Sequence, residues 1–173
     1  MNWAILDKSL FMYFWRMKIT LLAIGKTDSK PLQLLIEAYE KRLKHYIGFT
    51  FEVIPDIKNT KNLSQAQQKE LEGQEILKRL QSSDHLILLD EKGKTHSSVQ
   101  FSQFLQKKMN SGLKNLVFVI GGPYGFSEAL YQKAQGRLSL SDMTFSHQMV
   151  RLFFIEQLYR GFTILKNEPY HHR

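Results

Sequence analysis

The sequence contains no cysteine among its 173 residues, and this absence excludes disulfide bonds and thiolate metal sites. It also lacks an apolar run near the ~20 residues that a membrane-spanning helix requires. Proline occurs only four times, and no tract of biased composition divides the chain. With 43% hydrophobic and 23% charged residues, the composition is that of one globular domain with a core of its own.

Acidic residues are scarce relative to basic ones. There are 24 lysines and arginines against 16 aspartates and glutamates, which gives a net charge of +8 and an isoelectric point near 9.6. Such an excess favours a polyanionic partner such as a nucleic acid. Solvated surface lysines account for the same excess, so charge alone leaves both interpretations open.

The first sixteen residues, MNWAILDKSLFMYFWR, become apolar and aromatic toward their end. Their longest uncharged stretch, Ser9–Trp15, is too short to span a membrane, and Asp7 stands where a signal peptide carries positive charge. A strand pattern begins at Met17. We therefore expect residues 1–16 to be an upstream extension with a mis-assigned start, and residues 17–173 to form a single domain. The alternative is a genuine segment whose aromatic side chains pack on the domain.

From Lys18 onward, short apolar runs alternate with longer stretches of helical periodicity, which predicts an α/β domain with a largely parallel sheet. The expected strands are Lys18–Ile24, Phe49–Ile54, His85–Asp90, Leu116–Ile120 and Leu138–Leu140. The expected helices are Pro31–Tyr46, Ser64–Leu80, Ser97–Gly112 and Ser146–Phe162, of which the second opens with a capping box.

The last expected helix, Ser146–Phe162, carries apolar residues around nearly its whole circumference. A helix of this kind must be buried on most of its sides. A sheet covers one side only, so we expect a second copy of the chain to cover another and the protein to be a homodimer. The alternative is a monomer that encloses the helix completely.

One loop joins a buried strand to a glycine turn in the stretch VFVIGGPYGF, residues 117–126, and Ser127 follows as a helix cap. Glycines let backbone amides approach a ligand closely, although a glycine turn after a strand is more often only a turn. The spacing is not that of the G-x-G-x-x-G dinucleotide fingerprint. The Gly93-Lys94-Thr95 stretch is no phosphate-binding loop either, because Leu88 occupies the position of its first glycine.

Two further segments follow strands. Leu88–Gly93 ends a buried run in two acids and a glycine, and Ser139–Arg151 leads into the apolar helix. Ligands of open α/β sheets bind beyond the carboxyl ends of the strands, where these segments and the glycine turn are expected to lie. Taken alone, His147 and Arg151 are more often capping or pairing residues than catalytic ones.

The spacing of Glu156 and Arg160 predicts a local ion pair on the last helix. The chain then ends in an aromatic and basic tail, Asn167–Arg173. Tails of this length are usually disordered. Aromatic stacking and positive charge are also what RNA binding needs, so a tail that orders on a substrate is an equal alternative.

Together these segments resemble one family, the RlmH-type SPOUT methyltransferases, which methylate N3 of a pseudouridine in bacterial large-subunit ribosomal RNA. The resemblance runs from Met17 to the C-terminus, and the family pattern has no counterpart of the upstream residues. Its carriers, in order, are MKITLLAIGK, LLDEKG, FVIGGPYGF, SLSDMTFSHQMVR, EQLYR and PYHHR. His172 is a small departure from the usual ending.

The resemblance implies an α/β knot, in which a parallel sheet carries helices on both faces and the C-terminal part forms a trefoil knot. It also implies a homodimer with S-adenosylmethionine as methyl donor. Carried over position by position, the donor is held by Leu89, Gly121, Gly122, Leu140, Ser141, Asp142, Met143, Thr144 and Phe145. The residues expected to orient or deprotonate the base are His147, Arg151, Tyr170 and His171.

No metal is expected in the reaction, and the partner implied by the resemblance is the assembled ribosome with its 23S RNA, which places the protein in the cytoplasm and off the membrane. A rival of another class is a non-catalytic, basic RNA-binding or ribosome-assembly factor on the same fold. Donor binding and methyl transfer separate the two.

Overall fold

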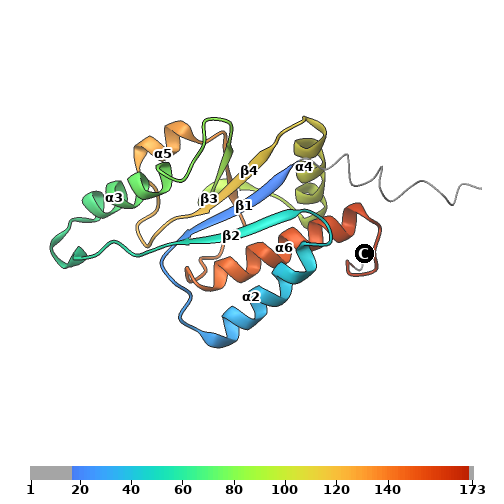
Figure 1. The fold of residues 1–173 in the computed structure, drawn as a ribbon, viewed down its shortest axis with the longest axis horizontal. Coiled ribbons are helices and arrows are strands. Elements are labelled where there is room, and N and C mark those ends of the chain that lie inside the picture. The colour runs from blue at the N-terminus through green and yellow to red at the C-terminus, as the bar shows by residue number, and fades with distance from the viewer. Residues whose placement is uncertain (1–16, 172–173) are drawn as a thin grey trace, which may run out of the picture.

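The computed structural model describes residues 17–171, so the prediction about residues 1–16 lies outside the described part and stays a prediction. Five parallel strands form one sheet in the order β2-β1-β4-β3-β5 (Figure 1). Their bounds are β1 Lys18–Ile24, β2 Gly48–Ile54, β3 His85–Thr95, β4 Asn115–Ile120 and β5 Gly136–Ser139. The α/β class and the parallel sheet predicted from the sequence are confirmed.

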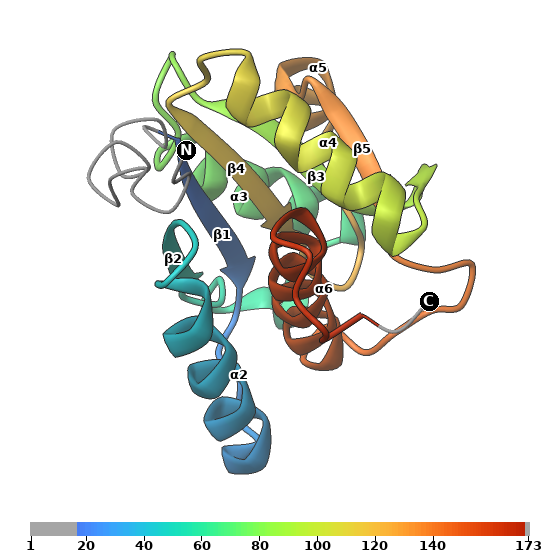
Figure 2. The ribbon, with the colours of Figure 1, turned by 90° about the vertical axis from the view of Figure 1, so that its right-hand side faces the viewer.

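Helices cover both faces of the sheet, as Figures 1 and 2 show. One face packs against α2, α4 and α6, and the other packs against α3 and α5. The bounds are α2 Lys30–Leu43, the short 3₁₀ helix η1 Thr60–Asn62, α3 Gln65–Leu77, α4 Ser98–Asn110, α5 Glu128–Lys133 and α6 Met149–Leu165. Strands buried on both faces explain the continuous apolar runs that marked β1 and β4 in the sequence. The trefoil knot stays a prediction.

Strand β3 is longer than predicted. It runs five residues beyond Asp90, and its pairing with β5 shifts register between Leu89 and Lys94, so that both pair with Leu138. Gly93 permits this irregularity, because an added Cβ would lie 2.6 Å from the backbone of Leu138. The acids of the LLDEKG stretch therefore bulge out at the carboxyl edge of the sheet.

Helix α6 lies between α2 and α4 on the sheet (Figure 2). Phe154, Ile155, Leu158 and Phe162 are completely buried, and Phe154 lies 4.7 Å from Phe118 of β4 between ring centroids. Two neighbouring helices and the sheet thus account for most of the burial that the sequence indicated. The homodimer stays a prediction.

At the amino edge of the sheet, His85 of β3 lies 2.8 Å from the Lys108 ammonium, measured from its Nε2 atom. Burial first, and then Lys108, lower the pKa of His85 below its ordinary 6.5. The unfolded chain therefore binds a proton at a higher pH than the folded chain does. Protonation of His85 therefore lowers the free energy of unfolding as pH falls below 6.5. This loss of stability disappears as pH rises toward 6.5 and above.

Replacing His85 with asparagine is accordingly expected to make the pH dependence of the unfolding free energy shallower below pH 6.5. Urea denaturation of both proteins at several pH values on either side of 6.5 measures this slope. Part of the slope remains in the variant, because burial also lowers the pKa of His96. An identical slope in the two proteins would remove His85 from the account.

Candidate functional site

A cavity of 1160 Å³ opens at the carboxyl edge of the sheet. Because all five strands are parallel, the segments that follow β3, β4 and β5 meet at this edge. The sequence-predicted donor residues that line the cavity are Leu89, Gly121, Gly122, Leu140, Ser141, Met143, Thr144 and Phe145. Asp142 is exposed and lies outside the lining residues. The three stretches singled out in the sequence therefore enclose one cavity.

The glycine turn after β4 supplies backbone to one wall. Gly122 and Gly125 close the turn through a hydrogen bond of 3.2 Å from the Gly125 amide to the Gly122 carbonyl. Gly125 has a φ of +82°, a left-handed conformation that side chains other than glycine rarely adopt. The turn thus presents main-chain groups and no side-chain bulk to the cavity between Gly121 and Gly122.

The β3 bulge forms a second wall around Asp90. Its carboxylate accepts hydrogen bonds from the Tyr131 hydroxyl at 2.7 Å and from the Lys92 amide at 2.8 Å. Burial, and after it the bond to Asp90, raise the pKa of Tyr131 to about 12. Tyr131 is therefore protonated at neutral pH and fixes the bulge. The sequence left Asp90 open between a solvated strand end and a role in the site, and here it organises the wall.

The segment after β5 forms the third wall. The Ser141 hydroxyl accepts from the Met143 amide at 2.9 Å, and the Ser141 carbonyl accepts from the Ser139 hydroxyl at 2.9 Å. Gln148 ties the end of the segment to the loop after β1, since its amide oxygen accepts from the Asp28 amide at 3.1 Å. Local bonds thus hold the segment in place although many of its side chains are exposed.

Sequence analysis missed a fourth wall, the start of α3. The cavity is also lined by Ser64, Gln65, Ala66 and Lys69. The capping box predicted at Ser64 is present, with the Ser64 hydroxyl accepting from the Gln67 amide at 3.2 Å. The capping box could have indicated this wall from the sequence, because a helix that follows β2 begins at the same carboxyl edge as the predicted loops.

Two of the four expected substrate residues differ sharply in position. His147 lines the cavity and is exposed. Arg151 is fully buried and does not line it: its guanidinium donates to the Thr27 hydroxyl at 2.8 Å and to the Ile24 carbonyl at 2.7 Å. Arg151 therefore fastens α6 to the end of β1, and its predicted contact with substrate stays a prediction.

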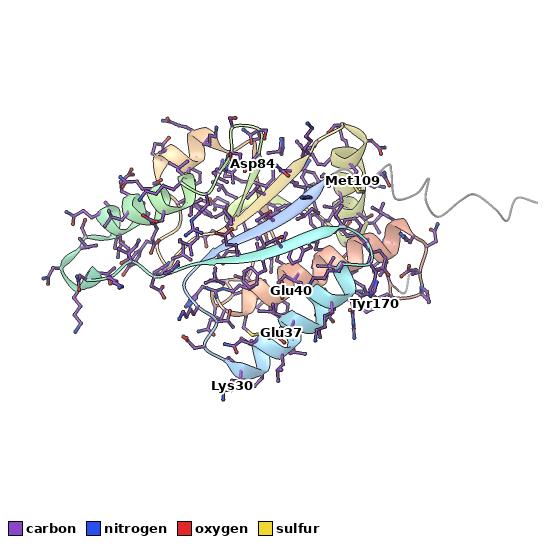
Figure 3. The ribbon with its side chains drawn as sticks, viewed as in Figure 1. Lys30, Glu37, Glu40, Asp84, Met109 and Tyr170 are labelled. Carbon is purple, nitrogen blue, oxygen red and sulfur yellow. The ribbon has the colours of Figure 1, made fainter. Side chains whose placement is uncertain are left out.

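Tyr170 and His171 also lie outside the cavity lining of their own chain. The Tyr170 hydroxyl donates to Glu156 at 3.0 Å and lies 3.1 Å from the Tyr39 hydroxyl, so Tyr170 is held against α2 and α6 (Figure 3). Burial, then the bonds to Tyr39 and Glu156, raise the pKa of Tyr170, so its phenol stays protonated at neutral pH. The predicted ion pair of Glu156 with Arg160 is present at 2.6 Å.

Ser127 occupies the predicted N-cap position of α5. Its side chain makes no capping hydrogen bond, and its hydroxyl is buried without a partner among the described residues. Within residues 17–171, no group of three or more histidines and acids is placed to hold a metal ion. None of the helices in that range is long and apolar enough to cross a bilayer.

A fold with a parallel sheet and a cavity of this size at the carboxyl edge defines a class of small-molecule-binding α/β proteins. A family model described as "Predicted SPOUT methyltransferase" matches residues 17–171. The chain belongs to the SPOUT methyltransferase family, whose members take the methyl group from S-adenosylmethionine.

Several relatives are similar over nearly the whole chain. A protein of Flavobacterium johnsoniae named ribosomal RNA large subunit methyltransferase H is 73% identical over 157 residues, which are 91% of this chain and 100% of the relative. A protein of the same name from Flavobacterium psychrophilum is 71% identical over the same shares. One from Parabacteroides distasonis is 65% identical over 90% of this chain and 99% of the relative.

Proposed function

We propose that this protein methylates N3 of a pseudouridine in the 23S RNA of the large ribosomal subunit, with S-adenosylmethionine as donor and the assembled ribosome as substrate. The observation that carries the proposal is the enclosure of one cavity by the three loops that bear the family's motifs. The names of the relatives support the RNA substrate. Acting on ribosomes places the protein in the cytoplasm.

The residues around the cavity fit the donor. Leu89, Leu140 and Met143 supply apolar surface for an adenosyl group, and the glycine turn supplies backbone polar groups for its edges. The donor carries its methyl group on a positively charged sulfonium, and transfer by in-line displacement requires orientation above all. The chain's contribution is then to hold the donor rigidly, which the hydrogen-bonded walls accomplish.

On the acceptor side, His147 is the one candidate base-orienting residue that reaches the cavity in its own chain. N3 of pseudouridine carries a proton at neutral pH, and a positioned imidazole is suited to accept or orient it. Tyr170 and His171 do not line the cavity of their own chain, so a catalytic role for them requires a second copy that presents its tail to the cavity.

A homodimer is part of the proposal. Met143, Phe145 and Phe153 remain 76%, 36% and 37% exposed, and the rings of Phe145 and Phe153 lie 4.7 Å apart. Phe145 and Phe153 form an apolar patch at the cavity, and a second copy would bury it together with Met143. Light scattering of the purified protein is expected to give twice the chain mass of 20.3 kDa. A single chain mass at working concentration would contradict the dimer.

Replacing His147 with alanine is expected to slow methyl transfer by about 10²-fold and to leave donor affinity nearly unchanged, because the imidazole acts on the acceptor. Single-turnover transfer measures the rate, and calorimetry measures the affinity. His45, an exposed histidine beyond the end of α2, provides the matched control, and His45→Ala should transfer at the wild-type rate. Equal losses of rate and donor affinity in His147→Ala would contradict the acceptor-side role.

Methyl transfer to ribosomal particles tests the function itself. The purified protein is mixed with labelled S-adenosylmethionine and with ribosomes, large subunits or free RNA from cells that lack the modification. The proposal predicts label in N3-methylpseudouridine, strongest with assembled ribosomes. RNA binding without transfer to any of the three particles would support the rival, a non-catalytic RNA-binding or assembly factor.

A further inference from the structure

Helix α3 carries a buried acid, Glu72, that the site described so far does not use. The side chain is only 3% exposed, and its Oε1 atom accepts a hydrogen bond of 2.8 Å from the Gln68 amide. Its Oε2 atom has no partner among residues 17–171. Buried carboxyl oxygens are nearly always hydrogen-bonded, so this exception in a well-packed wall calls for an explanation.

Glu72 lies directly behind the glycine turn of the cavity. A Cβ added to Gly122 would overlap the Glu72 carboxyl, and Oε2 is the atom it would meet first. Gly122 itself lines the cavity, as does Lys69, one turn before Glu72 on α3. The unpartnered oxygen is therefore separated from the cavity by a single residue without a side chain.

The charge of this carboxyl is not neutralised locally. The ion pairs of the described chain involve Glu75, Glu52 and Glu156 but not Glu72. Burial raises the pKa of Glu72, the bond from Gln68 opposes that rise, and the negative charge of Asp56 adds to it. A buried acid in this position responds to a cation placed on the other side of Gly122, because water does not screen the interaction there.

We propose that Glu72 is a positioning residue that makes the cavity prefer the positively charged methyl donor over its demethylated product. The inference rests on the proposed function, which places S-adenosylmethionine in this cavity. Donor and product differ by the sulfonium charge and the methyl group. An ionised Glu72 stabilises the charged donor and gains less from the uncharged thioether of S-adenosylhomocysteine, so product leaves more readily.

Donor binding is also expected to release a proton from Glu72. When the donor binds, its positive charge favours ionisation of Glu72, and the released proton passes to the buffer. When the product binds, this driving force is missing. Proton release on binding is measured by calorimetry in two buffers that differ in ionisation enthalpy, with the wild-type protein at mildly acidic pH.

The test compares wild type with Glu72→Gln, which keeps the shape of the side chain and removes its charge. The variant is expected to bind S-adenosylmethionine about 10-fold more weakly, to bind S-adenosylhomocysteine within about twofold of wild type, and to release no proton. The matched control is Glu70→Gln, an exposed acid on the same helix, which should behave as wild type.

Three results would overturn the inference. Equal weakening of donor and product in Glu72→Gln would assign the residue a merely structural role. An unchanged preference would show that its charge does not act on the cavity. Equal proton release when the wild-type protein binds donor or product would also show that the charge of Glu72 does not act on the cavity. That measurement requires no variant. Failure of wild type to bind either ligand would instead overturn the proposed function, and the inference with it.

Discussion

Replacing Gly122 with alanine is expected to lower the affinity for S-adenosylmethionine by about 10²-fold, because a displacement of about 1 Å in a binding wall has effects of that size. The added methyl group would overlap the Glu72 carboxyl, which is buried and cannot withdraw into solvent. The turn from Gly121 to Gly125 must then shift into the cavity that it lines. Calorimetric titration with the donor measures the loss.

The matched control is Gly48→Ala at the start of β2, where the new methyl group would lie 3.4 Å from the Lys18 side chain, an ordinary contact. This variant should bind the donor as wild type does. Combining Gly122→Ala with Glu72→Ala removes the overlapping carboxyl, so the double variant should bind the donor about 10-fold more weakly than wild type, the loss expected from the missing Glu72 charge alone. Wild-type affinity in Gly122→Ala alone would show that the turn is not a wall of the donor site.

Replacing Arg151 with methionine is expected to lower the free energy of unfolding by about 3 kcal/mol, since two hydrogen bonds are lost and a buried carbonyl is left unpaired. The bonds are those to the Thr27 hydroxyl and the Ile24 carbonyl, both in a fully buried environment. For a chain of this size, the same loss lowers Tm by about 6 to 12 °C. Urea denaturation gives the free energy and thermal unfolding gives Tm.

The control for this experiment is Arg79→Ala, which removes an exposed ion pair with Glu52. Its effect should not exceed about 1 kcal/mol, because exposed ion pairs contribute little. A stable Arg151→Met protein with slow methyl transfer and normal donor binding would contradict the structural role. It would restore the contact with substrate that the sequence suggested for Arg151.

The sequence could predict the strands and the position of the cavity for one physical reason. Strands buried on both faces appear as continuous apolar runs, and parallel strands bring the loops at their carboxyl ends together. The runs at β1 and β4 gave their bounds within one residue. The convergence of the loops after β3, β4 and β5 followed from the parallel sheet without knowledge of any side-chain contact.

Other features depend on tertiary packing that leaves no local pattern. The extension of β3 depends on the backbone of Gly93 meeting Leu138 of β5, a contact between residues 45 positions apart. Glu72 is one acid among several in a charged helix, and only the position of Gly122 against it makes it distinct. The sequence does not show whether Arg151 is exposed or buried, because its partners Ile24 and Thr27 lie at the end of β1 and on the loop after it.

Amide hydrogen exchange with and without S-adenosylmethionine tests whether the cavity at the carboxyl edge of the sheet binds the methyl donor. Donor binding there predicts slower exchange in the stretches 89–92, 121–126, 139–141 and 143–147, and no change around His85 at the opposite edge. Protection elsewhere in the chain, with those stretches unchanged at a saturating donor concentration, would contradict it.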